Sequence, residues 1–233
     1  MKNYDSNQAK VHRGKTPGKK ESVWENVREK FGILLTYSYL CIRFHYLRQK
    51  TMPEYDIALE LARLHILRGA DFVRQLKMLT GLYIFKPVEN EKDIFAAEGS
   101  HKEDMPSLVD AARKAVARGN KVYILPNPKG IRTADFIFEN KGVYKMYDLK
   151  TIQGKASVMN RLLESVGQTT HVLLNMTTDY RAISLAGSIK KYFEINPNAM
   201  EVLVFKGNKS ILLKRTSVDS RDFFKTFVKR YNK

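Results

Sequence analysis

The stretch that most constrains the fold of this chain is residues 133–151. Two runs rich in β-branched and aromatic residues flank the turn signal Glu139-Asn140-Lys141-Gly142. Runs of this kind on either side of a glycine-containing turn predict a β-hairpin. If Lys141 and Gly142 form a two-residue loop, Asn140 pairs with Val143, and the register of the whole hairpin follows from that pair.

Each run of the predicted hairpin carries a carboxylate. Counting back from the turn places Asp135 opposite Asp148, with Cβ atoms roughly 5 Å apart, so the two carboxylates can share one divalent cation. Side chains two residues apart on a strand share a face, which puts Lys150 beside Asp148. A bulge at Gly142 would slip this register by one residue. Taken singly, these residues also fit structural roles, the aspartates as turn or cap residues and Lys150 as a solvated strand end.

The combination resembles the PD-(D/E)xK nuclease core, written in this chain as Thr133-Ala134-Asp135 and Asp148-Leu149-Lys150. Ala134 stands where that family usually has Pro, and Asp148 stands where Glu is commoner. The wider block, from residues 117–126 to Gly167-Gln168-Thr169-Thr170-His171, is similar to the C-terminal tRNA nuclease domain of contact-dependent growth inhibition toxins. The resemblance extends to phage and mobile-element relatives of that domain and spans residues 100–215.

This resemblance implies an RNA endonuclease, with tRNA as the expected substrate and an immunity protein as a further partner. In the PD-(D/E)xK version, Asp135, Asp148 and one acid from the preceding helix hold Mg²⁺ or Mn²⁺. The ion lowers the pKa of a bound water. The helix acid is Glu103, Asp104 or Asp110, and we take Asp110 as the expected ligand.

A metal-free version is also implied, because the toxin relatives include barnase, EndoU, colicin and RelE types of fold. There Lys150 and Thr151, with a histidine such as His101, surround an RNA 2′-hydroxyl that attacks its own phosphate. In the metal-dependent version Lys150 instead orients the attacking water or stabilises charge on the phosphate. We therefore expect Asp135, Asp148, Lys150, Thr151 and His101 to be the catalytic residues.

The charge of the chain agrees with a polyanionic partner. The net charge is +17 and the sequence pI is about 9.8, and a surface this basic attracts nucleic acid at long range. An acidic protein or an anionic membrane would be attracted too, although we expect no membrane association. The expected nucleic-acid contacts are Lys155, Asn160, Arg161 and Gln168, around a helix over 158–166 that Ser157 caps. A function of another class remains open, a catalytically inactive nucleic-acid-binding or partner-binding module of a mobile element.

The chain divides into three expected parts. Residues 1–20 hold six Lys or Arg against one Asp and almost no apolar side chains, which predicts a disordered basic tail. Residues 21–87 show helical periodicity and predict a helical domain. Residues 88–100 read as a polar linker, and residues 88–233 as a whole predict a nuclease-like domain. That domain is α+β (mixed α/β), with a central mixed sheet of five or six strands flanked by helices.

The remaining expectations concern the compartment. The single cysteine, Cys41, excludes an internal disulfide framework and a cysteine-rich zinc site. We expect a cytoplasmic protein, or one delivered into the cytoplasm of a target cell. The apolar stretch 31–42 is too short to span a bilayer, and the first residues lack the apolar core of a signal peptide. The sequence leaves the oligomeric state open.

Overall fold

The computed structural model describes residues 57–82, 84–97, 104–128, 130–154 and 157–233. The expected basic tail and residues 21–56 of the expected helical domain lie outside these ranges. One compact unit contains all of the described residues. No described helix combines the length and the apolar character needed to cross a membrane.

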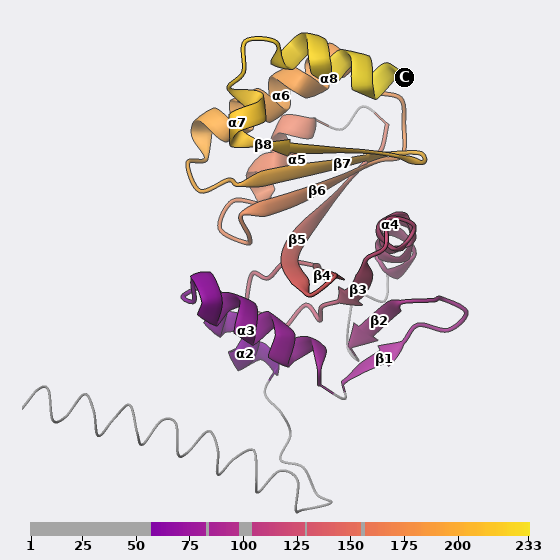
Figure 1. The fold of residues 1–233 in the computed structure, drawn as a ribbon, viewed down its shortest axis with the longest axis vertical. Helices are drawn as coiled ribbons and strands as arrows, with labels where there is room; N and C mark the ends of the chain where they lie inside the picture. Colours follow the sequence, from indigo (N-terminus) through magenta and orange to yellow (C-terminus); the bar gives the residue numbers. More distant parts are fainter. Residues whose placement is uncertain (1–56, 83, 98–103, 129, 155–156) are drawn as a thin grey trace, which may run out of the picture. The chain divides into compact units, whose positions relative to one another are not determined.

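A mixed β-sheet forms the centre of this unit, which confirms the predicted fold class (Figure 1). Within the described residues it has eight strands, and each strand is hydrogen-bonded to the next one along the chain. The strands are β1 Phe85–Pro87, β2 Ile94–Ala97, β3 Lys121–Ile124, β4 Phe136–Asn140, β5 Val143–Ile152, β6 His171–Met176, β7 Glu201–Lys206 and β8 Lys209–Lys214. The pairs β2–β3, β5–β6 and β6–β7 are parallel, and the other neighbouring pairs are antiparallel.

Helices lie on both faces of the sheet. They are α2 Ile57–Arg63, α3 Gly69–Thr80, α4 Met105–Val116, α5 Val158–Glu164, α6 Ala182–Ile195, α7 Arg215–Val218 and α8 Phe223–Asn232. The sequence predicted most of these elements, and Gly81 caps the C-terminus of α3 as expected. The stretch 88–100, expected to be a linker, instead contains β2. The apolar residues Ile94 and Ala97 of β2 are buried in the sheet, which is why this short segment orders as a strand.

The β4–β5 hairpin has the predicted register, because Asn140 pairs with Val143. Lys141 and Gly142 have φ angles of 50° and 80°. Positive φ at both central positions is typical of the two-residue turns whose twist matches that of antiparallel strands. The hairpin is therefore tight, without a bulge in the paired residues, and the pairing Phe136↔Tyr147 closes its far end.

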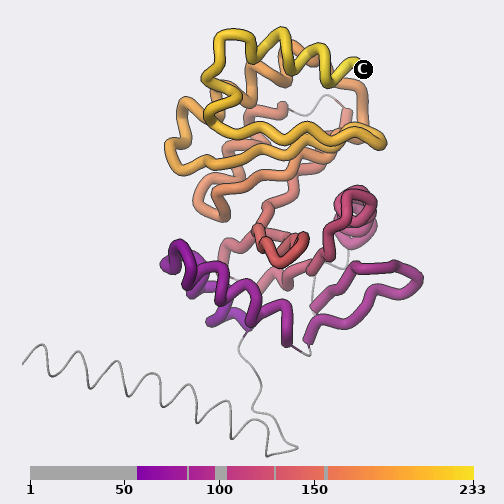
Figure 2. The backbone as a smooth tube through the Cα atoms, viewed as in Figure 1, coloured from indigo at the N-terminus to yellow at the C-terminus, as the bar shows by residue number. Residues whose placement is uncertain are grey.

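Strand β5 joins the two halves of the sheet. Its residues 143–147 pair with β4 on one side, and its residues 148–152 pair with β6 on the other. Figure 2 shows the chain passing along β5 from the earlier, purple-to-red half into the later, orange-to-yellow half. Asp148 is the first residue of β5 beyond the β4 pairing, so the predicted site stands where the strand changes partners.

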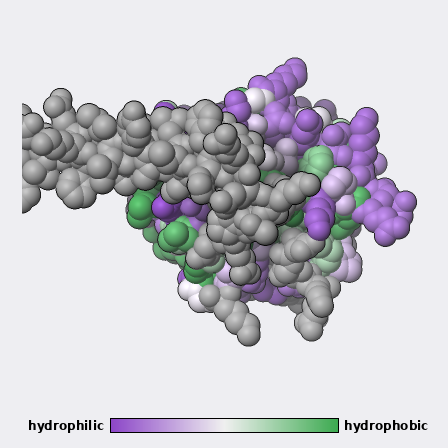
Figure 3. Space-filling model, turned by 90° about the horizontal axis from the view of Figure 1, so that it is seen from below, coloured by the Kyte–Doolittle hydropathy of each residue, from purple (hydrophilic) through white to green (hydrophobic). Residues whose placement is uncertain are grey.

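Three apolar clusters hold these layers together. Helices α5, α6 and α8 pack with β5–β8 in one cluster, and α2 and α3 pack with β1–β5 in another. Helix α4 packs on the opposite face of the sheet against Tyr147, Leu173 and Phe205. The described part of the expected helical domain thus shares its core with the sheet, because the apolar faces of α2 and α3 need a partner and the sheet offers one. On the described surface seen in Figure 3, hydrophobic side chains lie between hydrophilic ones.

Candidate active site

The alternation of side chains along β5 explains how a polar site fits between apolar cores. Met146 belongs to the cluster under α2 and α3, and Ile152 belongs to the cluster under α5 and α6. Asp148 and Lys150 lie between them on the same face of the strand. The two apolar clusters end on either side of these residues, so the carboxylate and the ammonium occupy the gap between two helical layers.

Asp135 faces Asp148 across the end of the hairpin, as the register predicts. The backbone N–H of Asp135 donates to the carbonyl of Tyr147 at 3.0 Å and so continues the β4–β5 pairing by one residue. The Asp135 Oδ2 atom accepts a hydrogen bond from the N–H of Leu149 at 2.6 Å. Lys150 Nζ lies 2.9 Å from Asp148 Oδ2 and 3.1 Å from Oδ1. The ammonium of Lys150 thus contacts both oxygens of the Asp148 carboxylate.

Burial makes it unfavourable for both carboxyl groups to carry a negative charge. Asp148 is 2% exposed, and burial together with the neighbouring Asp135 raises the pKa of Asp148 to about 7. Burial raises the pKa of Asp135 as well, although the Leu149 N–H and the Lys150 charge oppose the shift. The two carboxyl groups lie close enough for each to affect the pKa of the other. Below about pH 7 the pair therefore holds a proton, because two buried carboxylates and one ammonium would otherwise leave an excess negative charge.

A cavity of about 690 Å³ opens over this pair. Helix α4, the loop that leads into β4, the end of β5, and the α5 region all contribute to its wall. The described residues lining it are Asp104, Ser107, Leu108, Asn127, Ile131, Arg132, Thr133, Asp135, Asp148, Leu149, Lys150, Thr151, Gln153, Arg161 and Gln168. The structure therefore brings together six of the predicted site residues, namely Asp135, Asp148, Lys150, Thr151, Arg161 and Gln168.

The expected metal ligand Asp110 lies elsewhere. Its Oδ2 atom is 2.7 Å from Lys114 Nζ and accepts a hydrogen bond from Asn175 at 2.9 Å, and it does not line the 690 Å³ cavity. Asp104, at the N-cap of α4, does line the cavity. Its side chain makes no capping hydrogen bond, and its negative charge contributes to the raised pKa of Asp135.

Three further expected residues are not among the described residues of the wall. Asn160 is exposed on α5, where its backbone N–H donates to the N-cap Ser157 at 3.4 Å. Its side chain is not part of the cavity lining. His101 and Lys155 lie outside the described residues, as does the alternative helix acid Glu103. Within the described ranges, no three His, Cys, Asp or Glu side chains are grouped closely enough to hold a metal ion.

Among the residues of the wall that were not anticipated from the sequence, Ser107 and Arg132 make contacts between elements. Ser107 Oγ lies 2.7 Å from Thr151 Oγ1 and joins α4 to the end of β5. Arg132 donates to the carbonyl of Glu164 at 2.7 Å, which ties the loop before β4 to the end of α5. The available signals were weak: Ser107 follows Asp104 by one helical turn, and Arg132 stands next to the Thr133-Ala134-Asp135 motif.

Comparison with known proteins adds a distant similarity of fold. No known protein family and no curated protein matches the chain. A solved structure described as a CdiA-CT/CdiI toxin and immunity complex from Burkholderia pseudomallei is similar to it, with 15% sequence identity and a TM-score of 0.34. The similarity covers 55% of this chain and 96% of the other.

Proposed function

We propose that this protein is a metal-dependent nuclease that hydrolyses phosphodiester bonds of nucleic acid, with RNA, and tRNA in particular, as its substrate. The observation that carries the proposal is the buried Asp135–Asp148 pair with Lys150 at its edge, set in a cavity large enough for a nucleotide. The toxin-type resemblance of the sequence supports the same activity and makes an immunity protein the expected inhibitor.

The donor set fits a divalent cation. Hard ions such as Mg²⁺ prefer carboxylate oxygens, and Asp135 and Asp148 present theirs side by side. The proton that this pair retains below about pH 7 marks a place where positive charge is missing, and a cation would supply it. Asp135 and Asp148 would hold the ion, with Asp104 as the nearest described acid of α4. When bound, such an ion supplies Lewis-acid chemistry and a water of lowered pKa.

The remaining side chains suit a phosphodiester substrate. Lys150 is 12% exposed in its side chain, so its ammonium keeps a fixed position beside the reacting phosphate and stabilises the charge that develops there. Arg132 and Arg161 are exposed cations on the cavity wall, placed to bind phosphate oxygens. The Ser107–Thr151 hydroxyl pair adds hydrogen-bonding groups at the end of β5.

The test is incubation of the purified full-length protein with total tRNA and, separately, with plasmid DNA, each with Mg²⁺ and with EDTA. Asp148→Asn removes one carboxylate but keeps the size of the side chain, and we expect it to lower cleavage by about 100-fold or more. Lys150→Ala should have a comparable effect. Asp219→Asn, an exposed aspartate at the C-cap of α7, is the matched control and should cleave normally.

The outcomes separate the competing functions. Cleavage that requires both Mg²⁺ and Asp148 supports the proposal and identifies the substrate. RNA cleavage in EDTA that survives Asp148→Asn would favour the metal-free mechanism around Lys150 and Thr151. Salt-sensitive binding with no cleavage under any condition would overturn the nuclease and favour a binding module. Asp104→Asn and Asp110→Asn, compared directly, decide which acid of α4 contributes to the site.

A further inference from the structure

Helix α4 crosses the strands of the sheet rather than following them. Thr151 of β5 pairs with Asn175 of β6, and Asn175 pairs with Phe205 of β7, so these three residues form one row across the sheet. The first turn of α4 contacts this row through the Ser107–Thr151 hydroxyl pair. The helix therefore begins at the candidate active site and extends toward β7.

The next turns of α4 contact the next strands. Asn175 is hydrogen-bonded to both Asp110 and Lys114. The guanidinium of Arg118, just beyond the helix, lies over the Phe205 ring at 4.8 Å from its centroid. The contacts of α4 and the residues after it thus pass from β5 through β6 to β7.

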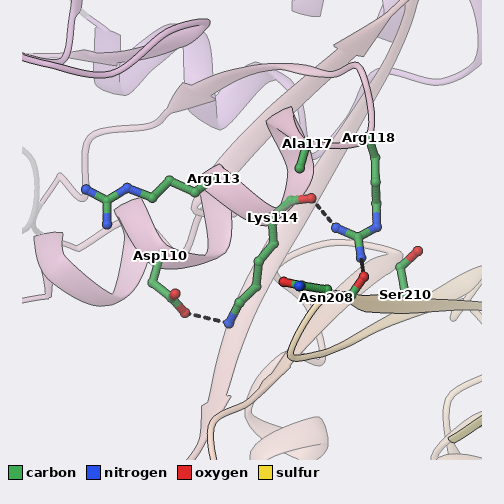
Figure 4. A pocket seen from close by; sticks show the side chains of 7 residues that line it. All are labelled: Asp110, Arg113, Lys114, Ala117, Arg118, Asn208 and Ser210. Carbon is green, nitrogen blue, oxygen red and sulfur yellow. Dashed lines mark hydrogen bonds and ion pairs between the residues drawn. The ribbon is translucent and has the colours of Figure 1, made fainter. Parts of the chain in front are cut away.

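A second cavity, of about 470 Å³, lies at the far end of α4 (Figure 4). Its lining residues are Asp110, Arg113, Lys114, Ala117, Arg118, Asn208 and Ser210. They come from two places, the second half of α4 with the residues that follow it, and the turn and first residues of β8. Three of the seven side chains are cations and one is an anion, so the cavity is positively charged.

The cation that distinguishes this cavity is Arg118. Lys114 is paired with Asp110 at 2.7 Å, and Arg113 is paired with Glu91. Arg118 instead donates to two backbone carbonyls, those of Lys114 and Asn208. Within the described part of the chain, no carboxylate forms an ion pair with it. Figure 4 shows its guanidinium directed from the end of α4 toward Asn208 and Ser210.

A guanidinium held in place without a neutralising carboxylate is suited to an anion. Its planar fork matches the oxygens of a phosphate, and its own hydrogen bonds and the Phe205 ring fix its position before any ligand arrives. Ser210 is exposed beside it and offers a hydroxyl. Lys114 adds a second positive charge on the helix side of the cavity.

We infer that this second cavity binds a backbone phosphate of the nucleic acid whose scissile bond lies in the first cavity, with Arg118 as its principal contact. The inference rests on the proposed nuclease function. The rise along α4 from Ser107 to its last residue, Val116, is about 13.5 Å, which corresponds to about four phosphates along one strand of a duplex, and Arg118 follows two residues later. The length of helix α4 sets the spacing between the bound phosphate and the cleaved one.

The experiment measures binding rather than cleavage, so that it does not depend on the chemistry. Fluorescein-labelled tRNA and a labelled DNA duplex are titrated with the full-length protein in EDTA over a range of salt concentrations. We expect Arg118→Gln to reduce the slope of log K against log salt by about one, and to lower the affinity roughly fivefold to tenfold at physiological salt. Arg230→Gln, an exposed arginine of α8 outside both cavities, makes the same charge change and should leave the slope unaltered.

Ser210→Glu tests the same cavity independently, in case Arg118→Gln does not fold. Ser210 is exposed on β8, and a glutamate there places a negative charge next to Arg118. It should lower the affinity as Arg118→Gln does. Unchanged binding by a folded Arg118→Gln and by Ser210→Glu would overturn the inference, as would an equal loss with Arg230→Gln. If the salt dependence of binding depends on Arg118 but the protein cleaves no nucleic acid, the proposed nuclease function is refuted and the proposed phosphate site is supported.

Discussion

Replacing Asp148 by Asn should stabilise the protein at alkaline pH. Asp148 is buried beside Asp135, and Lys150 is the one cation in direct contact with it among the described residues. Asn has nearly the same shape and carries no charge. After the substitution, Lys150 still faces the carboxylate of Asp135, whose pKa it lowers. The variant therefore removes the excess negative charge without leaving the buried ammonium alone.

The magnitude follows from the pKa of Asp148. It is raised from 3.8 to about 7, so above pH 3.8 the unfolded chain releases a proton that the folded chain still holds. The free energy of unfolding consequently falls as the pH rises between these two values. Three pKa units correspond to at most about 4 kcal/mol. The asparagine of the variant does not titrate, so this loss should be absent from it.

Thermal unfolding in EDTA at a series of pH values provides the assay. Near about pH 4 the variant and the parent should unfold at similar temperatures, and near about pH 8 the variant should unfold several degrees higher, since 1 kcal/mol shifts Tm by roughly 2–4 °C at this chain length. Excess Mg²⁺ should raise Tm of the parent alone, because only the parent has both carboxylates. A variant that is no more stable than its parent at alkaline pH would refute the reasoning that ionisation of both Asp135 and Asp148 destabilises the folded protein.

Two further predictions concern positions away from the cavity. Glu201 of β7 is buried and accepts hydrogen bonds from two side chains of β5, Lys145 at 2.7 Å and Tyr147. Glu201→Gln should destabilise the protein by about 1–3 kcal/mol in denaturant unfolding while nucleic-acid cleavage is retained. A selective loss of cleavage would place this cluster in the active site. Gly142→Ala puts a side chain at a φ of 80° in the hairpin turn and should cost about 1 kcal/mol, measured in the same way; an unaltered stability would mean that the turn relaxes to another type.

The hairpin and its site were accessible from the sequence because local chemistry determines them. The residues Lys141 and Gly142 accept positive φ, and this fixes a two-residue turn. The period of two along a strand then places Asp135 opposite Asp148 and Lys150 beside it. None of these steps needs information from distant parts of the chain, which is why the register and the acidic pair were predicted together with the fold class.

The tertiary structure determines which acid of the α4 region lines the cavity. Asp104 and Asp110 are both plausible from helical periodicity, and the choice depends on how α4 is rotated and where it crosses the sheet. The contacts that fix this are the Ser107–Thr151 hydroxyl pair and the bonds of Asp110 to Lys114 and Asn175. The Ser107–Thr151 and Asp110–Asn175 contacts join residues far apart in the chain, and no periodic pattern in the sequence records them.

The boundaries of the sheet show the same division. Residues 94–97 were read as part of a polar linker, because a short apolar run between charged residues has little periodicity of its own. They form β2 because β3 offers them a parallel edge and the adjacent cores bury Ile94 and Ala97. The sequence alone determined the hairpin, its acidic pair and the mixed α/β class, since these depend on neighbouring residues. Only the tertiary structure decided which helix acid, which arginines and which cavities surround the pair, because those depend on long-range packing.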